Sequence, residues 1–138
     1  MPSKNQLFIK RSKIPGAGKG LFTKCFIAKG TRIIEYKGRI TTWKAVQQGT
    51  KFNGYVYYVN RNFVIDAMPY KAALARYAND GDGIVKVKGL KNNCAYKKDN
   101  DKIFITAIKD IEAGAEILVS YGKDYWDVIR YNEKLKNK

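Results

Sequence analysis

The chain contains no histidine. This absence removes the side chain that proteins use most often as a proton acceptor near neutral pH and as a neutral metal ligand. Cysteine is almost as scarce, because only Cys25 and Cys94 are present and they do not form a C-x-x-C pair. We therefore expect no zinc site or other metal site. A single disulfide between the two cysteines stays open, although nothing in the sequence requires one.

Long apolar runs are also absent. No stretch approaches the roughly 20 apolar residues of a membrane-spanning helix. The first ten residues, MPSKNQLFIK, lack the apolar region of a signal peptide. We therefore expect a soluble, intracellular (cytoplasmic) protein with no membrane partner. A chain of 138 residues, 45% of them hydrophobic, can bury a core of its own and fold as one domain.

Acidic residues are few. The chain has 12 of them against 27 lysines and arginines, which gives a formal net charge of +15. An acidic partner, such as nucleic acid or an acidic protein, would explain this excess. Biased composition explains it slightly better, because most of the cations are lysines and the chain is also rich in asparagine, isoleucine and tyrosine. Charge alone therefore leaves the partner open.

The order of β-branched, aromatic and glycine residues predicts a mainly β fold of short strands with two or three small helices. The expected strands are at 7–11, after the glycine-rich turn at 14–22, and at 32–38, 55–59, 63–66, 103–108 and 116–121. One helix is expected at 41–49, with Thr41 or Thr42 as its N-cap and Gly49 at its end. Further helices are expected from Pro69 to about Tyr77 and at 124–138, and a loop with a basic strand inside it at 80–92.

The glycine-rich stretch GAGKGLF, residues 16–22, is not a nucleotide-binding motif. A dinucleotide site needs a helix after the glycines, whereas strand-forming residues follow here. A P-loop needs Ser or Thr after its lysine, whereas Gly20 follows Lys19. Taken alone, the stretch is either a flexible turn or a backbone surface that a ligand can approach closely.

Four stretches carry more information together than singly. They are GAGKGLFT, EYKG, VIDA…ARYAND followed by NNCAY, and GAEILVSYGKDYW. In this order they resemble the SET-domain family of protein-lysine methyltransferases, from about Ile9 to Trp126. The resemblance implies a SET-domain fold of small sheets, in which the C-terminal part crosses a loop like a pseudoknot. It also implies one SET domain over residues 1–138, with a core at about 9–122 and a segment at 123–138 that closes the cofactor site.

The zinc-binding modules that flank many SET domains are not present, so the chain is similar to minimal bacterial or viral members. The resemblance implies S-adenosylmethionine as the cofactor. The residues implied in binding it are Ala17, Gly18, Lys19, Gly20, Tyr77, Asn79, Asp80, Tyr121 and Trp126. Asp80 stands where the family usually has a histidine that contacts the adenine through its backbone. Trp126 suits stacking on the adenine, and it suits equally well the anchoring of a C-terminal helix.

The chain departs from the family after Asp80. The family's Ser-Cys-x-Pro-Asn is absent, and a longer loop, GDGIVKVKGLK, leads to Asn92 and Asn93. Asn93 resembles the family's second asparagine. Asp66 resembles an acidic residue that precedes a helix in the family, and a plain helix cap is an equally good interpretation.

The resemblance implies Tyr121 as a catalytic residue, with Tyr36 and Tyr96 as further walls of the lysine channel. Methyl transfer from a sulfonium to an amine needs no general acid, because the leaving thioether is neutral. It does need a neutral amine, and a narrow apolar channel lowers the pKa of lysine. Tyrosine hydroxyls can then orient the amine without adding charge. The absence of histidine is therefore compatible with this chemistry.

A protein substrate bearing the target lysine is the implied partner. Tyr55, Tyr57 and Tyr58 are expected to line one wall of its groove, where the substrate adds as an extended strand. One face of that strand can equally belong to the core. An acidic or DNA-associated partner fits the positive charge.

Two other functions stay open. A basic nucleic-acid-binding protein would use aromatic residues as stacking platforms and would bind in a salt-dependent way. A catalytically inactive SET domain would bind peptide without turnover, and Asp80 in place of histidine favours this alternative.

Overall fold

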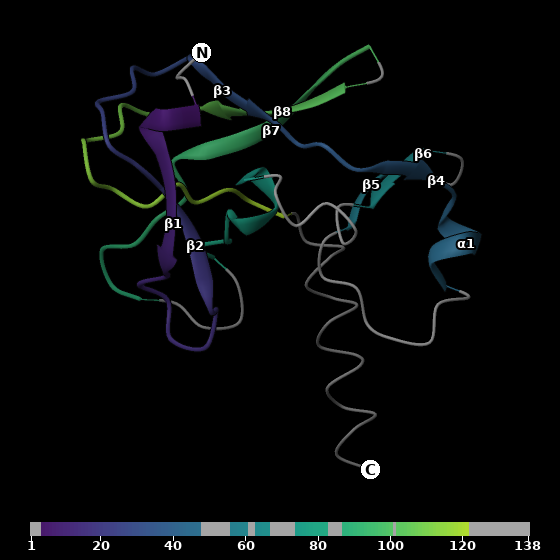
Figure 1. Ribbon diagram of the computed structural model, residues 1–138, viewed down its shortest axis with the longest axis horizontal. Helices are drawn as coiled ribbons and strands as arrows, with labels where there is room; N and C mark the ends of the chain where they lie inside the picture. The colour runs from purple at the N-terminus through teal and green to yellow at the C-terminus, as the bar shows by residue number, and fades with distance from the viewer. Residues whose placement is uncertain are drawn as a thin grey trace.

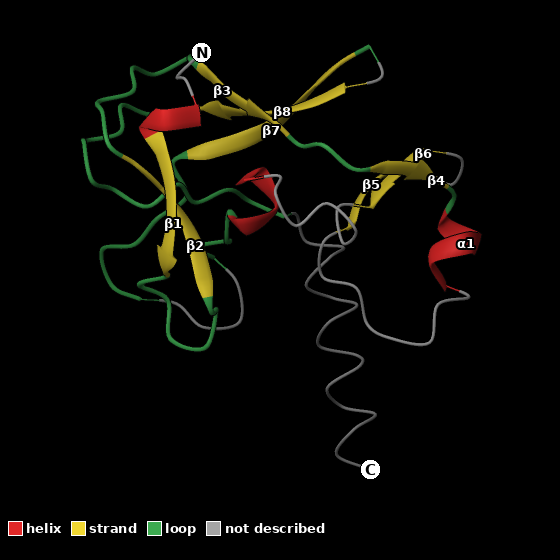
Figure 2. Cartoon of the chain, viewed as in Figure 1, coloured by secondary structure: helices red, strands yellow, loops and turns green. Residues whose placement is uncertain are grey.

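The computed structural model describes residues 4–47, 56–60, 63–66, 74–82, 87–100 and 102–121. Over these residues the chain is mainly β, with short antiparallel strands and few helical turns (Figure 2). The mainly β class predicted from the sequence is thus confirmed.

The described strands form three small antiparallel sheets. The first pairs β1 (Leu7–Arg11) with β2 (Lys19–Thr23), and the second has the order β3 (Arg32–Glu35), β8 (Lys102–Ala107), β7 (Cys94–Asp99). The third has the order β4 (Arg39–Thr41), β6 (Phe63–Asp66), β5 (Val56–Asn60). The helical elements are η1 (Lys4–Gln6), α1 (Trp43–Gln47) and η2 (Leu74–Tyr77). In Figure 1 the first sheet and the third lie at opposite sides, with the second between them.

Several local predictions are confirmed. The strands expected at 7–11 and 63–66 are β1 and β6, with the predicted bounds. Helix α1 begins after Thr42, whose hydroxyl oxygen accepts the backbone N–H of Ala45 at 3.2 Å. Thr42 is therefore the N-cap. The helix end at Gly49, the tail at 124–138 and the first part of the helix expected from Pro69 lie outside the described residues.

The prediction of one continuous strand at 32–38 is wrong. Strand β3 ends at Glu35, and pairing resumes at Arg39 in a different sheet. The backbone N–H of Tyr36 still donates to Ile103 of β8, whereas Ile40 is already in register with Ile65 of β6. The chain therefore changes its pairing partner between the two sheets, which a local pattern does not reveal.

Strand β7 was not predicted. Its sequence, CAYKKD, has charged residues over its second half, and it forms an edge of its sheet, where lysines are tolerated and useful. The basic strand expected inside the 80–92 loop is not found at 80–82 or 87–92, the parts of that loop that the structure describes. The strand expected at 116–121 is also absent, and single bridges at Glu116, Leu118 and Val119 take its place.

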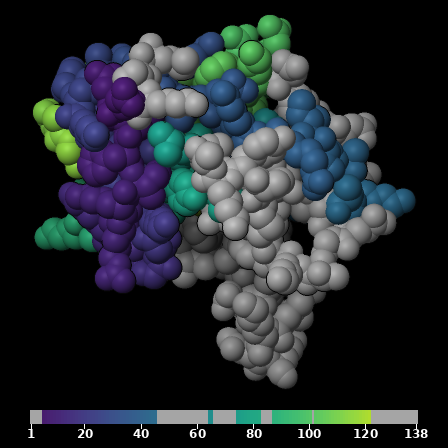
Figure 3. All heavy atoms as spheres, viewed as in Figure 1, coloured from purple at the N-terminus to yellow at the C-terminus, as the bar shows by residue number. Residues whose placement is uncertain are grey.

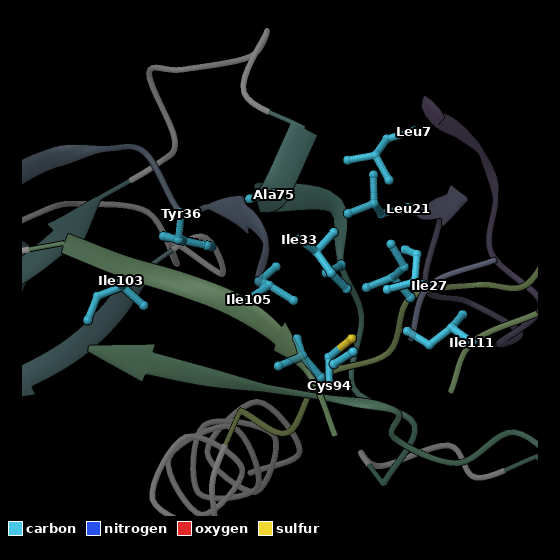
Figure 4. Packing of buried hydrophobic residues seen from close by; sticks show 14 of the residues in the cluster. Leu7, Leu21, Ile27, Ile33, Tyr36, Ala75, Cys94, Ile103, Ile105 and Ile111 are labelled. Atoms are coloured by element: carbon cyan, nitrogen blue, oxygen red, sulfur yellow. The ribbon is translucent and has the colours of Figure 1, made fainter. Parts of the chain in front are cut away.

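The hydrophobic core runs through the first two sheets and reaches the third. Strand β8 is central, and Ile103, Phe104 and Ile105 are all buried. In the close view of Figure 4, Leu7 and Leu21 lie at one end of the cluster, and Tyr36 and Ile103 lie at the other. Both cysteines are free thiols, and burial raises the pKa of Cys94 to about 12.

Residues 115–121, which we call the C-terminal segment, cross between parts of the chain that are distant in sequence. The N–H of Ile117 donates to the carbonyl of Leu21 at 2.7 Å, and the N–H of Val119 donates to Asn79 at 2.8 Å. On its other side, Leu118 accepts the N–H of Cys94 at 3.0 Å. The segment is therefore bonded to both ends of the 79–94 stretch, as the expected pseudoknot-like crossing requires.

Candidate active site

The turn between β1 and β2 has a backbone shape that requires glycine. Gly16 and Gly18 have φ angles of 80° and 72°, in the left-handed region that other residues rarely adopt. The turn is closed by a bond of 2.8 Å from the N–H of Ser12 to the carbonyl of Gly18. A Cβ built on Gly18 would meet no atom within 4 Å, so the backbone faces open space there. Ala17 and Lys19 flank this exposed glycine.

A buried carboxylate lies under the turn. Glu116 is only 3% exposed, and its Oε2 accepts the Ser12 hydroxyl at 2.6 Å while its Oε1 accepts the Lys13 N–H at 3.0 Å. A Cβ built on Gly20 would lie 2.5 Å from Oε2, so the carboxylate occupies the space that a side chain at 20 would need. Sequence reasoning missed Glu116 and Ser12, although a lone glutamate at the head of the apolar run ILV was a usable signal.

Asn79 connects this turn to the segment after η2. Its Nδ2 donates to the carbonyl of Lys19 at 3.0 Å and lies 3.5 Å from Oε2 of Glu116. Its own carbonyl accepts the N–H of Val119. The structure thus brings Lys19 and Asn79, which are 60 residues apart, into direct contact. Tyr77 is the last residue of η2, two positions before Asn79, and lies half-buried against the core cluster.

Asp80 is buried, with 5% exposure, and its carboxylate faces protein groups. Its Oδ1 accepts the N–H of Asp82 at 2.8 Å and the Nδ2–H of Asn92 at 2.9 Å. Its Oδ2 accepts the backbone N–H of Tyr121 at 2.9 Å. The side chain therefore joins the base of the 80–92 loop to the C-terminal segment.

Tyr121 is held at two points. Its backbone is bonded to Asp80, and its hydroxyl donates a hydrogen bond to the carbonyl of Ala78. Asn93 fixes the same segment from the other side, since its side-chain amide donates to the carbonyl of Glu116 and accepts the N–H of Leu118, both at 2.9 Å. These side-chain bonds replace the ladder that a regular strand would have.

The other two tyrosines of the predicted channel meet each other. The rings of Tyr36 and Tyr96 lie edge to face, with centroids 5.7 Å apart. Tyr36 is buried inside the core cluster, and Tyr96, Tyr121 and Tyr77 pack against that same cluster. The structure therefore gathers four tyrosines of the predicted site, Tyr36, Tyr77, Tyr96 and Tyr121, around one hydrophobic cluster.

The remaining predicted residues are less defined. Tyr55 and Trp126 lie outside the described residues. Tyr57 and Tyr58 lie in β5, and their backbones are in register with Ile65 and Val64 of β6. The roles predicted for these residues stay predictions.

The charge on the first hairpin is one-sided. Residues 1–34 include no aspartate or glutamate, and the exposed cations Lys10, Arg11, Lys13, Lys19 and Lys24 lie on β1, on β2 or beside them. In Figure 3 the hairpin atoms, drawn in purple, cover one side of the molecule. Lysines are also used in packing, since the Lys10 ammonium lies 4.5 Å from the ring centroid of Phe22.

The part of the chain that the structure describes holds no cluster of three or more His, Cys, Asp or Glu side chains that could bind a metal ion. Among the same residues, no helix is long and apolar enough to cross a membrane.

The family model of the SET domain matches residues 18–122, which is most of the chain. This protein therefore belongs to the SET-domain family. The fold agrees, since a solved structure described as the methyltransferase domain of human PR domain-containing protein 2 superposes with a TM-score of 0.64. The two share 26% sequence identity, over 86% of this chain and 78% of that one. No curated protein sequence matches significantly.

Proposed function

We propose that this chain is an S-adenosylmethionine-dependent protein-lysine N-methyltransferase, acting in the cytoplasm on a protein substrate. The observation that carries the proposal is the contact between the Asn79 amide and the carbonyl of Lys19. This contact joins the open glycine turn to the segment that holds Tyr121. A ligand site and a candidate catalytic tyrosine are thereby linked through one side chain, in a chain that belongs to the SET-domain family.

The residues at the turn fit the proposed cofactor. Gly16 and Gly18 expose backbone to open space, which lets a large ligand come close. When bound, S-adenosylmethionine supplies a methyl group on a positively charged sulfur, which a neutral amine can attack. In this proposal Ala17, Gly18, Lys19 and Gly20 hold it through their backbone, and Asn79 through its side chain. Tyr77, Asp80, Tyr121 and Trp126 complete the proposed set.

The tyrosines provide for the amine. The rings of Tyr36 and Tyr96 form an edge-to-face pair, and in this proposal such aromatic walls disfavour the charged form of a lysine and lower its pKa. The Tyr121 hydroxyl has one proton and two lone pairs, and its proton is used on the carbonyl of Ala78. A tyrosine oxygen that donates its proton can also accept an N–H, and in this proposal the Tyr121 oxygen accepts one from the incoming amine. An acceptor at this point turns the amine lone pair toward the methyl carbon, and such alignment is worth several kcal/mol.

The partner in this proposal is a protein that bears the target lysine. Tyr55, Tyr57 and Tyr58 are proposed to line its groove. The cations of the first hairpin favour an acidic or DNA-associated substrate over a strongly basic one, because Lys10, Arg11 and Lys19 repel like charge.

Calorimetry with S-adenosylmethionine tests the proposal. The wild type is compared with Asn79→Ala and with Asn5→Ala, which changes an exposed asparagine in η1. We expect the wild type and Asn5→Ala to bind alike and Asn79→Ala to lose at least about tenfold in affinity, which corresponds to the loss of one or two hydrogen bonds. The same proteins are then incubated with methyl-labelled cofactor and cell extract, and label on lysine is sought by mass spectrometry.

Binding with transfer of label supports the proposal. Binding of cofactor with no transfer to any protein would instead favour the inactive, peptide-binding alternative. Absence of cofactor binding, together with salt-dependent binding of a DNA duplex, would favour the nucleic-acid-binding alternative.

A further inference from the structure

The three residues Ala78, Asn79 and Asp80 hold the C-terminal segment along its length. The carbonyl of Asn79 accepts the N–H of Val119 at 2.8 Å, as a neighbouring strand would. Two positions further on, the ladder is replaced by a side chain, since the Asp80 carboxylate accepts the N–H of Tyr121 at 2.9 Å. The carbonyl of Ala78 then accepts the hydroxyl of the same tyrosine. Tyr121 is therefore clamped at its backbone and at the tip of its ring by residues two positions apart.

We propose that the Asp80 carboxylate is a positioning group, which fixes Tyr121 for methyl transfer, while the cofactor is held by backbone atoms, those of Asp80 included, and by other side chains. This inference rests on the proposed function and goes beyond it, because the contact with the cofactor that the family resemblance implies at this position is made largely through backbone atoms. Asp80 is 5% exposed, and both of its oxygens have protein donors. Its side chain thus acts on the C-terminal segment.

A carboxylate is the group that these contacts require. Three N–H donors converge on Asp80, from Asp82, Asn92 and Tyr121, and an ionised carboxylate offers acceptor sites on both oxygens. An asparagine offers one acceptor oxygen and one NH₂ group. Whichever way it is turned, the NH₂ faces a donor, so at least one buried N–H is left unpaired. A histidine offers at most one acceptor nitrogen and meets the same difficulty.

The other oxygen of Asp80 ties Tyr121 to the long loop. Oδ1 holds the Asn92 amide, whose own oxygen accepts the N–H of Gly81 at 2.7 Å. A Cβ built on Gly81 would lie 3.2 Å from that oxygen and from the Leu90 carbonyl, so the base of the loop is tightly closed. The contact between Asp80 and Asn92 thus joins two departures from the family pattern. They are the aspartate in place of histidine and the longer loop. Asn92→Ala removes the contacts that close the base of the loop and keeps the Asp80–Tyr121 bond. This variant therefore separates the role of Asp80 in the loop from its role in holding Tyr121.

The test compares Asp80→Asn with Asp82→Asn, a matched control on the exposed neighbour. Both changes remove one negative charge from the same loop. Only the first removes an acceptor from Tyr121, because the amide oxygen at 80 pairs two donors when it faces Asp82 and Asn92, and the NH₂ then faces the Tyr121 N–H. Amide hydrogen exchange is measured by NMR at Tyr121, with the Val119 amide as an internal reference because its acceptor is the Asn79 carbonyl. Cofactor affinity is measured by calorimetry, and transfer kinetics are measured with S-adenosylmethionine as the varied substrate and one labelled acceptor protein.

In the wild type we expect the Tyr121 amide to be protected. In Asp80→Asn we expect its protection to fall about tenfold or more while Val119 keeps its own, and kcat to fall by about 10- to 100-fold through misplacement of Tyr121. The KM and Kd for S-adenosylmethionine should stay within about threefold, and Asp82→Asn and Asn92→Ala should keep most of kcat.

Other outcomes would overturn the inference. They are an unprotected Tyr121 amide in the wild type, an unchanged kcat in Asp80→Asn, equal effects in the two aspartate variants, or a loss confined to cofactor affinity. If Asp80→Asn does not fold, the exchange rate of the Tyr121 amide in the wild type and the kcat of Asn92→Ala still test the inference. If the wild type transfers no methyl group although Tyr121 is protected, the proposed function fails while the Asp80–Tyr121 contact stands. The two failures are thus distinguishable.

Discussion

Glu116 provides the sharpest test of how the site is built. Glu116→Gln keeps the shape of the side chain and removes its charge. The carboxylate accepts the Ser12 hydroxyl at 2.6 Å and the Lys13 N–H at 3.0 Å, on different oxygens, and lies 3.5 Å from the Asn79 amide. A glutamine has one oxygen for these donors, so its NH₂ must face either Lys13 or the pair formed by Ser12 and Asn79.

The magnitude follows from these contacts. An unpaired buried donor costs about 1–3 kcal/mol, and hydrogen bonds to a charged group are worth about 1.5–3 kcal/mol each. Relief from burying a charge offsets part of this cost, because the neutral amide is easier to desolvate. We therefore expect Glu116→Gln to lower the free energy of unfolding by about 2 kcal/mol. The free energy of unfolding of a 138-residue domain is roughly 7–20 kcal/mol, so a change of this size is readily measured.

Urea unfolding followed by circular dichroism measures this effect, with Glu112→Gln as the control. Glu112 is exposed on the same segment, and its replacement should change stability by no more than about 0.5 kcal/mol. We also expect weaker binding of S-adenosylmethionine by Glu116→Gln, because the Ser12–Gly20 turn and the Asn79 amide lose a shared anchor. A Glu116→Gln protein as stable as the wild type would refute the argument that the turn depends on this carboxylate.

Three further predictions concern the same framework. Gly20→Ala should destabilise the fold by about 1–3 kcal/mol in urea unfolding, because its Cβ would lie 2.5 Å from Oε2 of Glu116; full stability would show that the carboxylate moves freely. Asn93→Asp should cost about 1–3 kcal/mol, because an acceptor would then face the Glu116 carbonyl; a smaller loss than that of an exposed asparagine variant would contradict this. Burial raises the pKa of the Cys94 thiol from 9.0 to about 12, so the unfolded state loses its proton first and stability falls as pH rises from about 9 toward 12. At pH 10 this loss is about 1.4 kcal/mol and should be missing in Cys94→Ala, and a thiol reagent should react with Cys25 before Cys94; equal slopes in the two proteins would exclude the effect.

The sequence by itself determined the features that depend on neighbouring residues. The strand at 7–11, an N-cap at Thr41 or Thr42 and the glycine turn at 16–18 follow from local steric and hydrogen-bonding preferences, and the structure has them, with Thr42 as the cap. The order of the four motifs determined the family, because each motif keeps its place along the chain. Four of the predicted site residues are joined in pairs by hydrogen bonds in the structure. Asn79 bonds Lys19, and Asp80 bonds Tyr121.

Only the tertiary structure decided which groups meet across the chain. Glu116 bonds Ser12 across 104 residues, and the Asp80 carboxylate bonds Tyr121 across 41. A local pattern marks neither side chain as a buried acceptor, since an acidic residue is usually exposed unless a partner is supplied. For the same reason the sequence did not predict β7, whose lysines are not typical of a strand, or the change of sheet after Tyr36. Local preferences are settled within a few residues, whereas burial and pairing depend on what the folded chain brings alongside.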